Sequence, residues 1–134
     1  MEYLRANTKI YLSGRFGDQT QLTLGKFKYF EDKYPHIIFI NPLRINQGIG
    51  MVDENFKKTG MYDRSTCFEF DIKAIQQCDG IVAVNNWKTS PGAITELMIS
   101  ANTGKMIFLE EEDCVLKECN DKVFRYNIKD LINI

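Results

Sequence analysis

A hydroxyl and a carboxylate stand close together in the segment S-P-G-A-I-T-E, which runs from Ser90 to Glu96. Ser90 is typical of a helix N-cap, and Pro91 is typical of the first helical position, where a missing N–H costs nothing. The amino end of a helix offers free N–H groups and a positive dipole, which favour a phosphate or another anion. The segment therefore predicts an anion-binding helix start with an acid nearby. A solvated glutamate that only complements the dipole is the alternative at this point.

Strands alternate with helices around this segment. The short β-branched run Ile81–Val84 precedes it, and the helix that begins at Ser90 is expected to end at Gly104. The alternation predicts a single domain over residues 1–134, an α/β flavodoxin-like or Rossmann-like three-layer sandwich with a mostly parallel sheet of about five strands. The other expected strands are Thr8–Ser13, His36–Ile40, Lys105–Leu109 and a short fifth at Lys122–Tyr126, and the other expected helices are Gln19–Tyr34, Asp63–Gln77 and Ile128–Ile134.

Two segments carry weaker helix and strand signals. Arg44–Tyr62 is glycine-rich and irregular, which predicts a lid or a substrate-side flap with a short helix near Asp53–Lys57. The acidic run Glu110–Asp113 is expected to be a solvated loop. The apolar side chains expected to face the core from the helices are Leu22, Leu24, Phe27, Phe30, Phe68, Ile72 and Ile75.

Polar and small residues follow the expected strands. In a parallel sheet the ligand binds at the carboxyl ends of the strands, near the reversal of strand order. That edge collects Ser13, Gly14 and Arg15 after the first strand, Asn41 after the second, and residues 85–92 after the third. Gly14 permits close approach of backbone to a ligand. Because separate stretches converge there, we expect the binding site at this edge.

Composition narrows the class of protein. The 134 residues are 44% hydrophobic and 26% charged, with a net charge of −1. No broad basic footprint for nucleic acid follows from this balance. The apolar runs are too short to span a bilayer, and the first residues lack the apolar segment of a signal peptide, so we expect a cytoplasmic protein without a membrane partner.

The chain has four cysteines and one histidine. No cysteine pair has C-x-x-C spacing, so neither a zinc site nor a disulfide framework is expected. We therefore expect no metal and no cofactor.

Several ordered motifs resemble the nucleoside 2-deoxyribosyltransferase superfamily. They are K-I-Y-L-S-G from Lys9, N-P-L from Asn41, D-x-x-x-I-x-x-C-D-G-I-V-A-V from Asp71, and W-x-x-S-P-G-A-x-x-E from Trp87. The resemblance spans Lys9–Leu109, and its nearest pattern is an uncharacterised branch with a W-x-x-S-x-G-A signature.

The resemblance implies an enzyme in which Glu96 attacks the anomeric carbon of a deoxyribosyl group. A carboxylate nucleophile of this kind forms a glycosyl-enzyme ester, which water or a second base resolves with retention. Tyr11 matches the tyrosine that orients the nucleophile. Asp71 matches the aspartate near the leaving base, whose protonation would be its natural role. The relatives also complete their sites across subunits, which implies a homodimer or a higher homo-oligomer.

Ser90 bears on the substrate. The transferases have an aspartate at this position, whereas related 2′-deoxynucleoside 5′-monophosphate N-hydrolases have a phosphate-binding serine. The serine form implies a nucleotide substrate, with donors from the amides of Gly92 and Ala93. Arg15 is either the cation for that phosphate or a solvated surface arginine. Trp87 either stacks on a base at the mouth or forms a half-buried wall.

A different class of function is also open. A non-catalytic nucleotide-binding module would keep the anion cradle and use it for sensing. The joint presence of Tyr11, Asp71 and Glu96 favours the enzyme, because a binding module needs no nucleophile. The base, the sugar, and the choice between hydrolysis and transfer are left open by the sequence.

Overall fold

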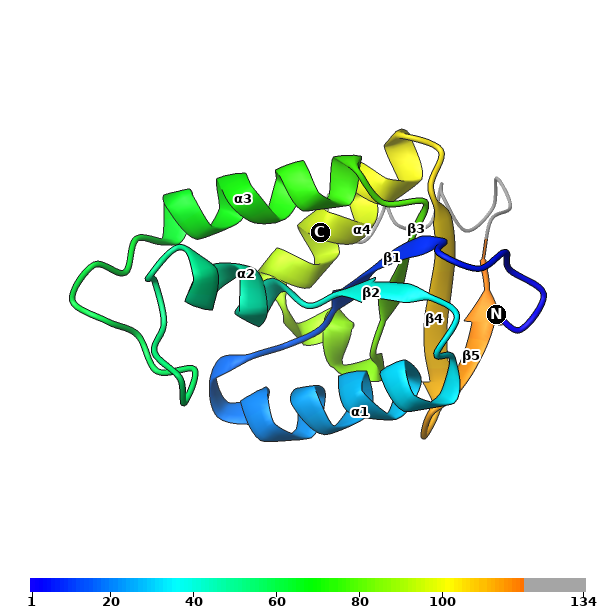
Figure 1. Cartoon of the computed structure of the whole chain (residues 1–134), viewed down its shortest axis with the longest axis horizontal. Helices are drawn as coiled ribbons and strands as arrows, with labels where there is room; N and C mark the ends of the chain where they lie inside the picture. The colour runs from blue at the N-terminus through cyan, green and yellow to red at the C-terminus, as the bar shows by residue number, and fades with distance from the viewer. Residues whose placement is uncertain (120–134) are drawn as a thin grey trace.

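One five-stranded sheet forms the centre of the part of the protein that the computed structural model describes, residues 1–119 (Figure 1). The α/β fold with a mostly parallel sheet confirms the fold class expected from the sequence. The strands are β1 (Lys9–Ser13), β2 (Ile38–Ile40), β3 (Gly80–Ala83), β4 (Met106–Glu112) and β5 (Val115–Glu118). The α-helices are α1 (Thr20–Lys33), α2 (Pro42–Gly48), α3 (Arg64–Gln76) and α4 (Pro91–Asn102), and the short 3₁₀ helices are η1 (Gly17–Gln19) and η2 (Asn85–Thr89).

The strand order is β2-β1-β3-β4-β5, and only β5 runs antiparallel among these strands. The chain leaves β1 toward β2 and returns on the other side of β1 to form β3. The strand order therefore reverses between β1 and β3, where doubly wound sheets open a crevice outside the carboxyl ends. Ser13 pairs with Ala83 at the last residues of these two strands.

Helices cover the two faces of the sheet unequally. α1 lies on one face, and α3 and α4 lie on the other (Figure 1). Because side chains alternate along a strand, Ile10 and Leu12 pack in the core with α1, whereas Tyr11 packs in the core with α3 and α4. Ser13, two residues beyond Tyr11, therefore points toward α4 as well.

The ends of α4 follow from local chemistry. Ser90 caps the helix by accepting a hydrogen bond from the Ala93 amide at 3.2 Å, and Pro91 occupies the first turn. Gly104 follows the helix with a φ of +73°, a left-handed conformation that glycine adopts without strain. The N-cap and the stop expected from the sequence are both confirmed.

The segment after β2 is more regular than expected. Pro42–Gly48 forms α2, because Asn41 caps it by accepting from the Leu43 amide at 3.0 Å. The prediction of a short helix near Asp53–Lys57 is wrong. The Asp53 carboxylate instead accepts from the amides of Asn55 and Lys57 at 2.8 and 3.0 Å, which closes a turn.

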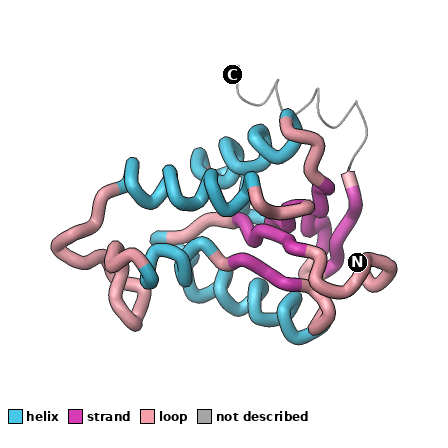
Figure 2. Tube along the Cα trace, turned by 45° about the horizontal axis from the view of Figure 1, so that its top comes forward, coloured by secondary structure: helices cyan, strands magenta, loops and turns pink. Residues whose placement is uncertain are grey.

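The remaining loop, residues 49–62, projects from the end of the molecule at which β2 ends (Figure 2). A bridge between Val52 and Lys58 makes it hairpin-like. The Thr59 hydroxyl donates to the Gly50 carbonyl at 2.7 Å, which ties the two arms together. Its role as a lid or flap stays a prediction.

The acidic run is not a solvated loop. β4 continues to Glu112, and Glu110 is buried with an exposed fraction of 3%. Both carboxylate oxygens of Glu110 accept from the Lys26 ammonium, at 2.8 and 2.9 Å, which compensates the buried charge. Tight turning at Asp113 then allows β5 to pair back on β4.

Two inward-facing assignments were also wrong, since Leu22 is 55% exposed and Phe68 is 39% exposed. The strand expected at Lys122–Tyr126 and the helix expected at Ile128–Ile134 lie outside the described residues. Among residues 1–119, every helix is too short or too polar to cross a membrane.

Gly14 is expected to be sterically required where β1 ends against β3. A Cβ at this position would lie 2.5 Å from Val84 Cγ2 and 2.9 Å from Thr23 Cγ2. We expect Gly14→Ala to lower the free energy of unfolding by about 1–3 kcal/mol through overpacking, measured by urea denaturation.

The matched control is Gly25→Ala in the interior of α1, where an added Cβ meets nothing within 4 Å. Because alanine favours a helix over glycine by roughly 0.5–1 kcal/mol, this variant should be stabilised. Equal effects of the two substitutions would contradict the close approach at Gly14.

Candidate active site

The Glu96 carboxylate lies in the second turn of α4 and is buried, with an exposed fraction of 7%. The Tyr11 hydroxyl donates to Oε2 in a short hydrogen bond, and the Ser13 hydroxyl donates to Oε1 at 2.8 Å. Both donors come from β1, because alternation places residues 11 and 13 on the same face of the strand. The carboxylate is thus fixed at both oxygens.

Burial dominates the ionisation of Glu96. Desolvation raises the pKa of Glu96 to about 7, against the hydrogen bonds from Tyr11 and Ser13, which lower it. Burial and the neighbouring carboxylates raise the pKa of Tyr11 well above its ordinary value, so the phenol remains a donor. Glu96 can therefore ionise near neutral pH while Tyr11 keeps its proton.

Asp71 supplies a second carboxyl group from α3. Its Oδ1 atom is buried and has no hydrogen-bond partner within the described part of the chain. Burial, and next the charge of Glu96, raise the pKa of Asp71 to about 8. Because the pKa of Glu96 is about 7 and that of Asp71 is about 8, the state with an ionised Glu96 and a protonated Asp71 is populated near neutral pH, and this is the division of roles used in acid-base catalysis.

The amino end of α4 carries Ser90 beside the loop after β1. Because the Ser90 oxygen accepts from the Ala93 amide, that amide is already engaged, and the Gly92 amide is the next candidate donor. An added Cβ at Gly92 would meet only Ser90 Oγ, at 3.9 Å. The anion cradle expected from the sequence therefore depends on the Ser90 hydroxyl and the Gly92 amide.

Arg15 lies next to this helix end. Its Nη1 donates to Thr89 Oγ1 at 3.0 Å, and its Nε and Nη2 contact the Asp18 carboxylate at 3.1 and 3.2 Å. The Arg15 amide also donates to Asn86 Oδ1 at 2.9 Å, which fixes the loop. A guanidinium thus stands beside the residue that precedes Ser90.

Trp87 and Asn41, which the sequence placed among the substrate-binding residues, are buried and have structural contacts. Trp87 is only 4% exposed and packs in the core cluster that contains Tyr11, Ala93 and Leu97. This burial favours a wall over an open stacking face. Asn41 is buried, and its side-chain oxygen caps α2.

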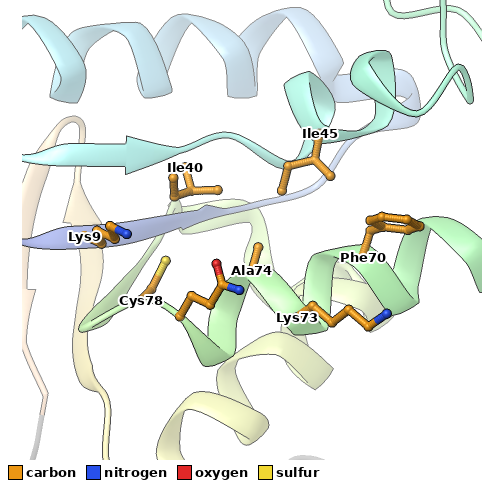
Figure 3. A pocket seen from close by; sticks show the side chains of 8 residues that line it. Lys9, Ile40, Ile45, Phe70, Lys73, Ala74 and Cys78 are labelled. Atoms are coloured by element: carbon orange, nitrogen blue, oxygen red, sulfur yellow. The ribbon is translucent and has the colours of Figure 1, made fainter.

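A cavity of about 430 Å³ lies between β2, α2 and α3 (Figure 3). None of Tyr11, Asp71 and Glu96 lines it, so this cavity and the acid pair are different features. The lining is mostly apolar with two lysines, and consists of Lys9, Ile40, Ile45, Phe70, Lys73, Ala74, Gln77 and Cys78.

The ion pair of Lys26 and Glu110, which lies near the carboxyl ends of β3 and β4, is not predicted by the sequence. The Asn85 and Cys114 amides donate to Glu110 at 2.8 and 2.7 Å, so the carboxylate joins two loops to α1. Glu110, Asp113 and Cys114 lie close enough to share a cation, but the Lys26 ammonium already occupies both Glu110 oxygens. No local signal distinguished Glu110 from its solvated neighbours.

The fold and the buried acid pair define a Rossmann-like α/β domain with a candidate active site at the reversal of strand order. Residues 8–109 match the family described as Domain of unknown function (DUF4406), and the chain belongs to that family. The match contains Tyr11, Ser13, Asp71 and Glu96.

A solved structure of a conserved protein from Enterococcus faecalis V583 is similar to this chain, with a TM-score of 0.59 and 18% identity. The similarity covers 78% of this chain and 63% of that chain, so the aligned part spans less than two thirds of the length of that protein. At this identity the likeness supports the fold alone. No curated protein matches the chain.

The raised pKa of Asp71 predicts a pH-dependent stability. The folded protein keeps a proton on Asp71 between its ordinary pKa of 3.8 and about 8, whereas the unfolded chain releases it. The free energy of unfolding should therefore fall as the pH rises through this window. Asp71→Asn removes the titration and should be more stable than wild type at pH 8 by a few kcal/mol, with the difference vanishing near pH 4.

Urea denaturation at several pH values measures this effect. The control is Asp32→Asn, an exposed carboxylate on α1 that pairs with Lys28 at 3.3 Å, and it should produce no comparable gain. A constant offset of Asp71→Asn at all pH values would contradict the raised pKa.

Proposed function

We propose that this protein cleaves the N-glycosidic bond of a (2′-deoxy)nucleoside 5′-monophosphate through Glu96, by hydrolysis or by base transfer. The observation that carries the proposal is the buried Glu96 carboxylate, held by the hydroxyl donors Tyr11 and Ser13, together with Asp71, whose pKa is raised to about 8 by burial and by the charge of Glu96. Burying a carboxylate is costly, and Glu96, unlike Glu110, has no cationic partner among the described residues, which makes it a candidate for chemistry rather than for a structural ion pair.

The proposed reaction assigns one step to each group. Ionised Glu96 attacks the anomeric carbon, the bond between this carbon and the base breaks, and the Asp71 proton passes to the leaving base. The resulting glycosyl ester is resolved by water or by a second base, whose released proton returns to Asp71, and the Glu96 carboxylate is restored. The order of the pKa values, about 7 for Glu96 and about 8 for Asp71, suits these roles near neutral pH.

The 5′ phosphate is proposed to lie at the amino end of α4. The Ser90 hydroxyl and the Gly92 amide are suitable donors, and the positive end of the helix dipole favours the anion. Arg15 would contribute charge from the loop after β1, in exchange for part of its contact with Asp18.

A nucleotide-binding module without catalysis is the alternative function. The proposed phosphate site at Ser90 and Arg15 would bind the nucleotide in either case. The enzyme is favoured by the buried Glu96 and by Asp71 Oδ1, which has no hydrogen-bond partner in the described part of the chain, since a sensor gains nothing from two costly carboxyl groups.

The proposal includes a cytoplasmic homo-oligomer. Phe68 and Phe70 of α3 are exposed by 39% and 38%, which supports a contact with a second copy near Asp71.

The decisive experiment follows base release from a panel of nucleoside 5′-monophosphates by chromatography. Glu96→Gln should lower the rate by at least about a thousandfold, because the isosteric amide lacks the nucleophile's charge. Nucleotide binding, measured by calorimetry, should be retained. A residual rate above about a tenth of wild type, equivalent to only ~1.4 kcal/mol, would exclude Glu96 as the nucleophile. Glu69→Gln on the exposed face of α3 is the matched control and should keep full activity.

A second prediction concerns Ser90 and the phosphate. Ser90→Ala should lower kcat/KM for a monophosphate by about 10- to 100-fold relative to the corresponding nucleoside, because a charge-assisted hydrogen bond is worth roughly 1.5–3 kcal/mol. Ser90→Asp should lower this ratio further by repelling the anion. Ser90→Thr keeps both the hydroxyl and the helix cap and should stay close to wild type.

The ratio of the two efficiencies separates phosphate recognition from helix capping, since a lost cap affects both substrates alike. If Ser90→Ala leaves the ratio unchanged, the 5′ group lies elsewhere.

A further inference from the structure

Ser13, at the end of β1, contacts the Glu96 carboxylate and has an exposed fraction of 0%. The sequence placed it among substrate-binding residues because it ends the first strand. Its hydroxyl instead donates to Glu96 Oε1 at 2.8 Å, on the oxygen that Tyr11 does not contact. A fully buried hydroxyl that already donates to a carboxylate is poorly placed to bind a substrate directly.

The geometry points to Ser13 as a positioning residue: its hydroxyl fixes Oε1 of Glu96 and keeps the buried carboxylate ionised. This inference deepens the proposed function and depends on it for the catalytic consequence. The hydrogen bond itself is a property of the fold and can be tested separately.

Loss of water around the buried Glu96 carboxyl group determines how readily it ionises. A buried carboxyl group prefers its neutral form unless donors replace the lost water. Tyr11 and Ser13 supply one donor to each oxygen, so each oxygen keeps a further lone pair. Removing the Ser13 hydroxyl leaves Oε1 without its donor, and the neutral acid is then favoured.

The titratable groups around Glu96 influence the site by charge or by a hydrogen bond to the other carboxylate oxygen. Asp71 from α3 is coupled to Glu96 by charge, and Tyr11 from β1 donates to Oε2. Cys78 raises the pKa of Tyr11. The β3 and β4 side chains in the same core cluster are apolar and include Ile81, Ala83 and Ile107.

The chain offers a matched control in Ser100. This serine is also fully buried, and its hydroxyl donates at 2.8 Å to the backbone carbonyl of the same residue, Glu96. Ser13→Ala and Ser100→Ala remove the same atom from the same kind of environment. Only the first removes a donor from the carboxylate.

The experiment is a pH titration of the Glu96 side-chain carboxyl signal by ¹³C NMR, with Glu96→Gln used to identify that signal. Ser13→Ala should raise the pKa of Glu96 by about 1–2 units, the size expected for losing one hydrogen bond to a charged group. Ser100→Ala should leave this pKa unchanged.

Two further variants keep the test independent of folding defects. Ser13→Cys fills nearly the same space with a weaker donor and should give a smaller upward shift. Ser13→Thr keeps the hydroxyl and should restore the wild-type pKa.

Kinetics supply the second readout. In Ser13→Ala the acidic limb of kcat/KM for base release should move to higher pH, with about a tenfold loss below the limb for each unit. A shift seen by NMR in a protein that releases no base would support the role of Ser13 and reject the proposed function. An unshifted Glu96 in Ser13→Ala, or an equal shift in Ser100→Ala, would overturn the inference, whether or not base release occurs.

Discussion

The hydrogen bonds from β1 to the Glu96 carboxylate are the interaction on which the site depends. A carboxylate cannot be buried at the sheet without donors, and Tyr11 and Ser13 supply them from one face of a single strand. The contact also fixes α4 against β1, although β3 is the strand that leads into α4. Residues far apart in the sequence are thereby held in one chemical unit.

The strand order explains why this unit forms at the carboxyl edge of the sheet. Because β1 lies beside both β2 and β3, its carboxyl end meets the start of α4 across the reversal point. Gly14 lets the chain leave β1 in close contact with Val84, so the loop that carries Arg15 passes near Ser90. The guanidinium therefore lies beside the start of α4, and Glu96 follows in the second turn of the same helix.

The protein buries charge in two different ways. Glu110 is neutralised by the Lys26 ammonium and by backbone amides, which makes it a structural tie between α1 and the β4–β5 hairpin. Within residues 1–119, the donors to the Glu96 carboxylate are the neutral hydroxyls of Tyr11 and Ser13, and burial raises its pKa to about 7 because no cation compensates the charge there. An ion pair of the first kind stabilises an arrangement, whereas a carboxylate of the second kind is suited to reaction.

The sequence by itself determined the alternation of strands and helices and both ends of α4, because capping serines, prolines and glycines act within a few residues. The alternation of side chains along β1, which puts Tyr11 and Ser13 on the same face, is also a local property of the sequence. Only the tertiary structure decided that Glu110 is buried, since its partner Lys26 lies 84 positions away. It also decided that Ser13 donates to Glu96 and that Asp71 Oδ1 is buried with no hydrogen-bond partner among residues 1–119. Burial and pairing across the sheet depend on which elements become neighbours, and no local pattern encodes that.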